Sequence, residues 1–177
     1  MTIKKILLTE DSKVDTDSPT ANYGASTLYQ TLYNAYNKQS ACLKCSPIQV
    51  KGTVISARLA LYGGLKGGIT TNLTISPLNS TWSETTVTWD TTPARGDVWD
   101  TIAPDAAGWW YWDLNTATVQ QWADGGNNYG MYLDQPVSSG TGADYMNWKS
   151  SETVDAEKPY VEITYNPLAS FLLNMMR

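Results

Sequence analysis

The segment from Trp82 to Trp89 reads Trp-Ser-Glu-Thr-Thr-Val-Thr-Trp and opens the part of the chain that decides the fold. Working outward from it, residues 109–114 read Trp-Trp-Tyr-Trp-Asp-Leu, and an Asn-Tyr-Gly triplet follows at 128–130. Seven of the eight tryptophans lie between residues 82 and 122. A buried indole N–H needs a hydrogen-bond partner. So many indoles among Thr, Asp and Gly predict an aromatic-rich β-domain.

The rest of the chain alternates β-prone runs with turn signals. In the clearest run, Leu59 and Leu61 face one side of a strand, while Ser56 and Arg58 face the other. Strands are expected at residues 3–8, 27–33, 40–45, 53–62, 72–76, 85–89, 109–114, 131–133, 145–149 and 160–165. This pattern predicts an all-β fold, an antiparallel β-sandwich of jelly-roll type.

One short internal helix is expected at residues 115–125. Asn115 is a good N-cap and Gly125 a good stop signal. Val119 and Trp122 are three residues apart, so they share the helix face that would cover one end of the sandwich.

A second, amphipathic helix is expected at the C-terminus. Asn166 suits its N-cap and Pro167 its first position. The expected apolar face consists of Leu168, Phe171, Leu172, Met175 and Met176. We therefore divide the chain into a β-sandwich domain (1–165) and a helical tail (166–177). Two roles remain open: the tail folds back onto its own domain, or it docks into another copy or another assembly subunit.

Composition narrows the classes of function. The 177 residues suffice for one domain, and a net charge of −5 argues against a nucleic-acid partner, because phosphate binding needs clustered Lys and Arg. No apolar run is long enough to insert into a membrane. The apolar part of residues 1–11 is too short for a signal peptide. We therefore expect synthesis in the cytoplasm without export by a signal peptide, and an extracellular location after release, on a virus particle.

Little catalytic chemistry is available. The chain has no His, which excludes Ser-His-Asp and Cys-His machinery and the usual zinc sites. Cys42 and Cys45 would point to opposite faces of a strand, one buried and one outward, so no disulfide is expected between them. Carboxylate pairs could support glycoside hydrolysis, but no spacing singles out a pair. We expect no enzymatic activity, no catalytic residue and no required cofactor.

Two binding sites can be suggested from residue types. A sugar platform needs exposed aromatic rings with polar neighbours, and the candidates are Trp99, Trp110, Trp112, Asp97 and Asp100. Core packing is the alternative for the tryptophans. A structural Ca²⁺ needs oxygen ligands, and the candidates are Asp11, Asp15, Asp17 and Glu152. A solvated acidic turn is the alternative there.

The order of these motifs resembles the DNRLRE, or disaggregatase-related, domain family, which is allied to a carbohydrate-binding module family. The resemblance rests on Asp15 and Asp17, Asn22-Tyr23-Gly24, 57–62, 82–89, Pro93, 119–122, Asn128-Tyr129-Gly130, Ser151-Glu152 and 159–165. One departure is Ala41-Cys42-Leu43-Lys44-Cys45, where the family has an apolar run ending in an aromatic residue. The resemblance implies a non-catalytic β-sandwich.

Two functional hypotheses follow. The first is a structural or adhesive β-sandwich of an extracellular assembly, most simply a virion surface protein (a capsid decoration or tail component), with a capacity to bind glycans. The alternative is a free-standing or excised carbohydrate-binding module for an extracellular polysaccharide. The sequence favours the first narrowly, because the chain starts at its own Met, keeps free thiols and ends in an apolar tail.

Overall fold

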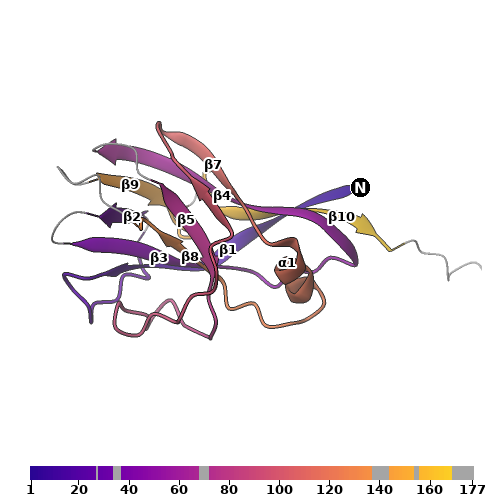
Figure 1. Cartoon of the computed structure of the whole chain (residues 1–177), viewed down its shortest axis with the longest axis horizontal. Helices are drawn as coiled ribbons and strands as arrows, with labels where there is room; N and C mark the ends of the chain where they lie inside the picture. Colours follow the sequence, from indigo (N-terminus) through magenta and orange to yellow (C-terminus); the bar gives the residue numbers. More distant parts are fainter. Residues whose placement is uncertain (27, 34–36, 68–71, 137–143, 154–155, 169–177) are drawn as a thin grey trace, which may run out of the picture.

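The computed structural model describes residues 1–26, 28–33, 37–67, 72–136, 144–153 and 156–168. These residues form ten strands and one helix (Figure 1). The elements are β1 (Thr2–Asp15), β2 (Leu28–Tyr33), β3 (Lys38–Cys45), β4 (Gly52–Gly67), β5 (Leu73–Pro77), β6 (Asp100–Ile102), β7 (Gly108–Asp113), α1 (Thr116–Ala123), β8 (Met131–Asp134), β9 (Asp144–Lys149) and β10 (Tyr160–Pro167). The all-β prediction is confirmed.

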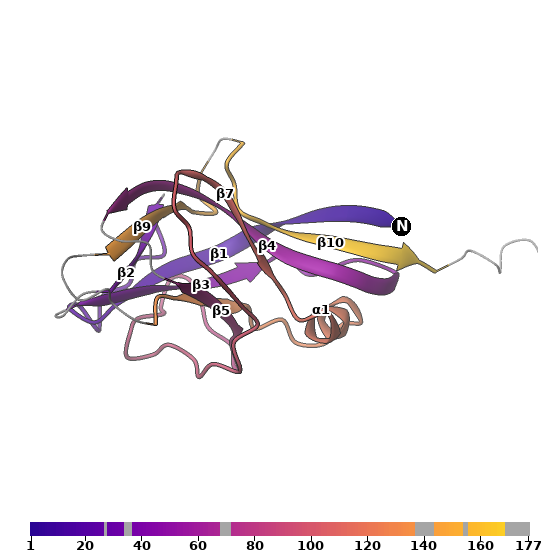
Figure 2. The same cartoon turned by 45° about the horizontal axis from the view of Figure 1, so that its top comes forward.

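Long strand β1 pairs with two strands, β10 and β3, that lie far apart in the strand order. Its first half pairs with β10 and its second half with β3, and the register shifts between Leu8 and Glu10. The order is β1-β10-β4-β9-β2-β3-β8-β5-β6, with β7 also paired to β4, and each of these pairings is antiparallel. Because β3 also contacts β1, the sheet curls back on itself, as the two views in Figures 1 and 2 show.

The main core fills the space that the curled sheet encloses. Alternate residues of β4, such as Leu59 and Leu61, are fully buried in it. Trp112 and Trp148 lie edge to face, with ring centroids 5.5 Å apart. Each buried indole has a hydrogen-bond acceptor: Trp112 Nε1 donates to the Leu73 carbonyl at 3.2 Å and Trp148 Nε1 to Thr31 Oγ1 at 3.0 Å. These two tryptophans therefore satisfy the requirement that burial imposes on indole.

A second, smaller core lies on the opposite face of β3 and β8. It contains Val14, Cys42, Leu78, Val87 and Tyr132. The chain between β5 and β6 contributes two of these residues and so covers this face (Figure 2).

This covering segment explains two departures from expectation. Cys42 and Cys45 do point to opposite faces and are unpaired, but both are buried, because each face has its own core. Residues 85–89 were expected to form a strand and instead form turns and irregular chain that carry Val87 and Trp89 onto the second core.

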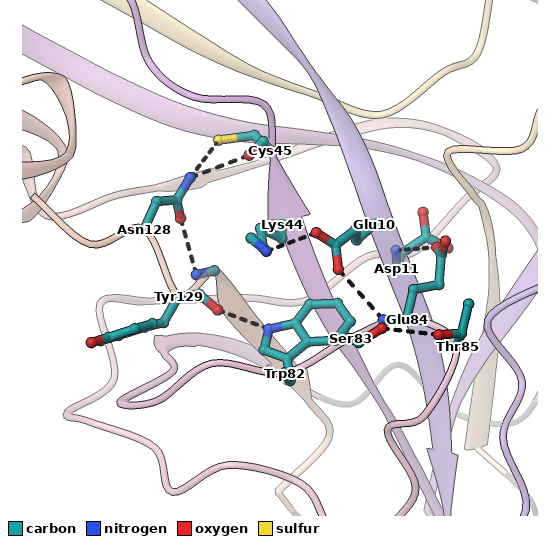
Figure 3. Close-up of polar contacts among 11 residues, drawn as sticks. Glu10, Asp11, Lys44, Cys45, Trp82, Ser83, Glu84, Thr85, Asn128 and Tyr129 are labelled. Atoms are coloured by element: carbon teal, nitrogen blue, oxygen red, sulfur yellow. Dashed lines mark hydrogen bonds and ion pairs between the residues drawn. The ribbon is translucent and has the colours of Figure 1, made fainter. Parts of the chain in front are cut away.

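The two Asn-Tyr-Gly triplets are local anchors between segments. In each, the Asn side chain accepts from the Gly N–H, at 3.3 Å for Gly24 and 3.0 Å for Gly130. Asn22 then donates to the carbonyls of Glu84 and Val87, and Asn128 donates to Cys45 (Figure 3). These contacts give both triplets a structural role.

The glycines of the two triplets serve different needs. Gly130 has φ +87°, a conformation that other residues rarely adopt, and a Cβ there would overlap the Leu43 carbonyl oxygen. Gly24 does not have a positive φ. It is required because a Cβ would overlap the carbonyl of Glu84.

Gly130→Ala is expected to lower the free energy of unfolding by about 2 to 4 kcal/mol, because it adds backbone strain and an overlap with main-chain atoms. Gly125→Ala is the matched control: it has φ +91° but no atom within 4 Å of the added methyl. The control should lose only about 1 kcal/mol. Urea denaturation measures both, and equal losses would show that the overlap at Gly130 is harmless.

The internal helix α1 forms as expected. Asn115 caps it, with its Oδ1 accepting from Thr118 N at 3.0 Å, and Val119 and Trp122 are buried. Gln120 Oε1 accepts from Val54 N at 2.8 Å and ties the helix to β4. Among the described residues, no helix is long and apolar enough to cross a membrane.

Three element boundaries differ from the sequence-based expectation. β1 continues through Asp15, although this strand was expected to end at residue 8. β4 continues through Gly63, which packs beneath Met146 and Trp148. Asn166 and Pro167 end β10 opposite Thr53 and Gly52, rather than starting a helix.

The expected tail helix lies largely outside the described residues. Leu168, the described member of its apolar face, is 73% exposed, and its backbone N–H donates to the Lys51 carbonyl at 3.0 Å. Phe171, Leu172, Met175 and Met176 lie outside the described residues. The assembly role of these five residues stays a prediction.

Candidate functional site

A surface pocket of about 440 Å³ lies where the chain before β6 meets the end of β7 and the start of α1. It is lined by Pro77, Asp97, Val98, Trp99, Asp113, Leu114 and Asn115. The pocket brings together Trp99 and Asp97, two of the five residues suggested for sugar binding. It adds Asp113 and Asn115, which sequence reasoning did not place beside them.

Trp99 is held at the pocket from two sides. Its backbone N–H donates to the Ile75 carbonyl at 2.8 Å. Its ring packs at a tilt of 57° against Trp122 of α1, with centroids 5.9 Å apart. The side chain is only half-buried, so one part of the indole rests on the main core and another part lines the pocket.

Asp100 accepts hydrogen bonds from two backbone N–H groups, one of which belongs to a residue that lines the pocket. Its Oδ2 accepts from Asp113 N at 2.8 Å and its Oδ1 from Thr101 N at 2.7 Å. This bridge fixes the end of β7 beside β6, and thereby the position of Asp113 at the pocket wall. Asp100 is therefore a positioning residue here.

The pocket combines groups that suit a sugar ring. An indole face can pack on the C–H groups of a pyranose, and carboxylates accept hydrogen bonds from hydroxyl groups. Asp97 and Asp113 are both exposed, so their carboxylates can reach a ligand.

Trp110 and Trp112 both lie on the inward face of β7. Trp112 is fully buried, and Trp110, packed partly against the main core, donates its Nε1 to the Ala106 carbonyl at 3.0 Å. The expectation that Trp112 contacts a glycan is wrong, because this side chain is fully buried, whereas the glycan contact of the half-buried Trp110 stays a prediction. Trp109 and Tyr111 form the outward pair. Alternation defined the two faces, but the pairing of β7 with β4 decides which is buried.

The outward aromatic residues of β7 are already covered by neighbouring side chains. Trp109 packs against Tyr62 and Tyr160, with ring centroids 5.6 and 5.3 Å apart. The Arg58 guanidinium lies 4.2 Å from the centre of the Tyr111 ring. Because these contacts occupy ring edges and faces, Trp99 in its pocket is the better candidate for stacking on a sugar.

A cluster of three carboxylates lies at a separate place, beneath the Trp82–Trp89 segment. Carboxylate oxygens of Asp11, Glu84 and Glu152 all lie within 4.8 Å of one another. Asp11 is in β1 and only 2% exposed. Glu84 Oε1 accepts from Asp11 N at 2.7 Å (Figure 3).

Burial and mutual repulsion raise the pKa values of Asp11 and Glu84. Burial, together with the smaller repulsion from Glu152 and Glu84, raises the pKa of Asp11 to about 7, although the hydrogen bond from Ser151 N at 2.5 Å lowers it. The pKa of Glu84 is also raised, first by burial. Glu152 Oε2 is buried and has no hydrogen-bond partner among the described residues. A bound cation would satisfy such a group.

The structure brings together only part of the expected calcium set. Asp11 and Glu152 are in the cluster. Asp15 lies further along β1 and binds Gln39 Nε2 at 2.7 Å and Lys13 Nζ at 3.2 Å. Asp17 is exposed, and its backbone N–H donates to Asp15. Asp15 and Asp17 are therefore not members of this cluster, and Glu84 takes the third place.

Comparison with known proteins identifies the class of protein to which the chain belongs. The model of carbohydrate-binding module family 96 matches residues 2–165, and the chain therefore belongs to this family. The expected alliance with a carbohydrate-binding module family is confirmed, whereas the narrower DNRLRE designation stays a prediction.

Curated relatives resemble the same part of the chain. It is 31% identical over 175 residues to the tRNA nuclease WapA of Bacillus subtilis (strain 168), with 89% of the chain covered. It is 30% identical over 177 residues to the tRNA3(Ser)-specific nuclease WapA of Bacillus spizizenii. The chain spans only 7% of the length of each.

Proposed function

We propose that the chain is a non-catalytic carbohydrate-binding module for an extracellular polysaccharide, and that the Trp99 pocket holds the sugar. The observation that carries the proposal is the placement of a half-buried indole beside two exposed carboxylates in a member of family 96. We further propose that the curled sheet is a jelly-roll sandwich, which would present this pocket at its edge.

This proposal replaces the hypothesis favoured at first. The family match supports carbohydrate binding, the earlier alternative, and not a capsid decoration or tail component. The relatives are named as nucleases, but the match covers a small share of their length, so we assign no nuclease activity to this chain. The acidic pI of about 4.6 agrees with a partner other than nucleic acid.

Trp99→Ala is expected to weaken binding of the recognised oligosaccharide at least tenfold, because it removes the apolar surface on which a ring would stack. The measurement is isothermal titration calorimetry, after a polysaccharide panel has identified the ligand. Trp109→Ala is the matched control, since it also removes a half-buried tryptophan but lies outside the pocket. Its affinity should match that of the unchanged chain. A Trp99→Ala protein that binds at full affinity would place the sugar elsewhere.

We also propose that the carboxylate cluster holds a structural Ca²⁺. Three oxygen ligands from Asp11, Glu84 and Glu152 suit this hard cation. The buried, unpartnered Glu152 Oε2 supports the proposal, because a cation would satisfy it. The ligands come from β1, the 82–89 segment and the turn after β9, so the ion would cross-link three distant parts of the chain.

A further inference from the structure

A groove of about 520 Å³ lies where α1 packs beside the start of β4, next to the end of β10 (Figures 1 and 2). It shares no residue with the Trp99 pocket. The residues that line it come from the chain into β4, the end of α1 and the position after β10: Val50, Lys51, Gly52, Thr53, Gln120, Ala123, Asp124 and Leu168. The segment that follows Leu168 lies outside the family match, which ends at residue 165.

Gln120 pairs polar groups of the two walls of this groove with one another. Its Oε1 accepts from Val54 N at 2.8 Å, and its Nε2 donates to the Gly52 carbonyl at 3.2 Å and to Asp124 Oδ1 at 3.0 Å. These bonds join β4 to α1 and hold the groove open at a fixed width. An occupant would therefore gain chiefly from contact with the apolar side chains of the lining, which are Val50, Ala123 and Leu168.

Leu168 brings the chain to the groove with an uncovered apolar side chain. It lines the groove and is 73% exposed. Its backbone N–H donates to the Lys51 carbonyl at 3.0 Å, which continues the pairing of Pro167 with Gly52 at the end of β10. The next residue of the chain therefore starts beside the groove.

From this arrangement we infer that the groove is the docking site of residues 169–177 of the same chain. Phe171 follows Leu168 by three residues, and three residues of extended chain span about 10 Å, so its ring can reach the groove. Docking would bury apolar surface of Leu168 and of the segment together. Six of the nine residues of the segment are apolar: Ala169, Phe171, Leu172, Leu173, Met175 and Met176.

The direct connection favours the groove of the same chain over that of a second copy. Both would offer the segment the same contacts, so the effective concentration decides between them. A short tether gives an effective concentration on the order of millimolar. A second copy would have to approach that concentration to compete, so at micromolar concentration we expect a monomer with a docked segment. This assigns the first of the two roles that the sequence left open for the tail.

Chymotrypsin cleavage after Phe171 and Leu172 measures the undocked population, because cleavage follows the open form when docking is fast. In the unchanged chain this cleavage should be roughly tenfold slower than in Ala123→Gln, whose longer side chain would fill the groove. Ala117→Gln is the matched control, since Ala117 lies in the same helix, is exposed and does not line the groove. Its cleavage rate should equal that of the unchanged chain.

Thr53→Glu keeps the inference testable if Ala123→Gln does not fold. Thr53 is exposed in the groove wall that β4 provides. A carboxylate there would oppose the burial of apolar side chains, because its desolvation costs free energy. Cleavage in this variant should also be roughly tenfold faster than in the unchanged chain.

Two results would overturn the inference. One is cleavage of the unchanged chain as fast as that of the groove variants. The other is protection that rises with protein concentration together with a solution mass above the 19.5 kDa of one chain, because the segment would then occupy the groove of a second copy. Protection in a monomer that does not depend on concentration, and that is lost in the groove variants but kept in Ala117→Gln, is the result we expect.

Discussion

Trp112→Ala is expected to lower the free energy of unfolding by about 3 to 5 kcal/mol, the usual cost of removing a buried large aromatic side chain. Trp112 is fully buried and lies edge to face with Trp148. Its indole also donates to the Leu73 carbonyl, so the alanine variant leaves a cavity and removes the partner of a buried acceptor. Urea denaturation followed by circular dichroism gives the loss directly.

The size of this loss distinguishes a core residue from a ligand platform. Trp112→Phe keeps most of the ring volume and should lower the free energy of unfolding by less, about 1 to 3 kcal/mol. This variant keeps the prediction testable if the alanine variant does not fold. Trp109→Ala, on the outward face of the same strand, should also lose less than Trp112→Ala. A Trp112→Ala protein as stable as the unchanged chain would mean that β7 faces the other way.

Without divalent cations, stability is expected to fall as pH rises from about 4 to about 7, by roughly 4 kcal/mol if Asp11 alone accounts for it. The folded pKa of Asp11, about 7, lies above the ordinary value of 3.8, so the folded state binds the proton more tightly than the unfolded state. Its contribution to stability is therefore present below pH 4 and lost through pH 7. Chemical denaturation in a chelator, at several pH values, measures the slope.

Calcium should remove this loss if the cluster binds it. At pH 7.5, a Ca²⁺ concentration one hundred times the dissociation constant would add about 2.7 kcal/mol. Asp11→Asn should flatten the pH profile and abolish the calcium effect, whereas Asp17→Asn, at an exposed position, should change neither. A flat profile in chelator would show that burial does not perturb Asp11. Unchanged stability on adding Ca²⁺ would exclude the ion.

Local patterns predicted most of the strands and the internal helix, because alternation and capping depend on neighbouring residues. Asn115, Val119 and Trp122 do what their spacing predicts. The prediction of a strand at residues 85–89 was wrong, although the Thr, Val and Trp residues of the 82–89 segment suit a strand. In the folded chain this segment covers the second core, which the sequence alone does not reveal. The continuation of β4 through Gly63 likewise depends on Met146 and Trp148, more than 80 residues away.

The candidate sites were predicted only in part, for the same reason. Trp99 and Asp97 are two residues apart in the sequence, and their joint presence in a loop was a usable signal. Asp113 reaches them through the pairing of β7 and the bridge from Asp100, which no local pattern reveals. In the acidic cluster, the sequence suggested Asp11 and Glu152 as calcium ligands. Glu84 comes from a third segment of the chain, and its contact with Asp11 N in the folded structure places it in the cluster.

Indole resonances offer the most direct test of the proposed site. Each of the eight tryptophans contributes one Nε1–H signal to a ¹⁵N-correlated NMR spectrum, and single substitutions assign them. Titration with a bound oligosaccharide should move the Trp99 signal, while Trp112 and Trp148, buried and hydrogen-bonded, should stay in place. A titration that shifts Trp109 and leaves Trp99 unchanged would contradict the account and move the site to the outward face of β7.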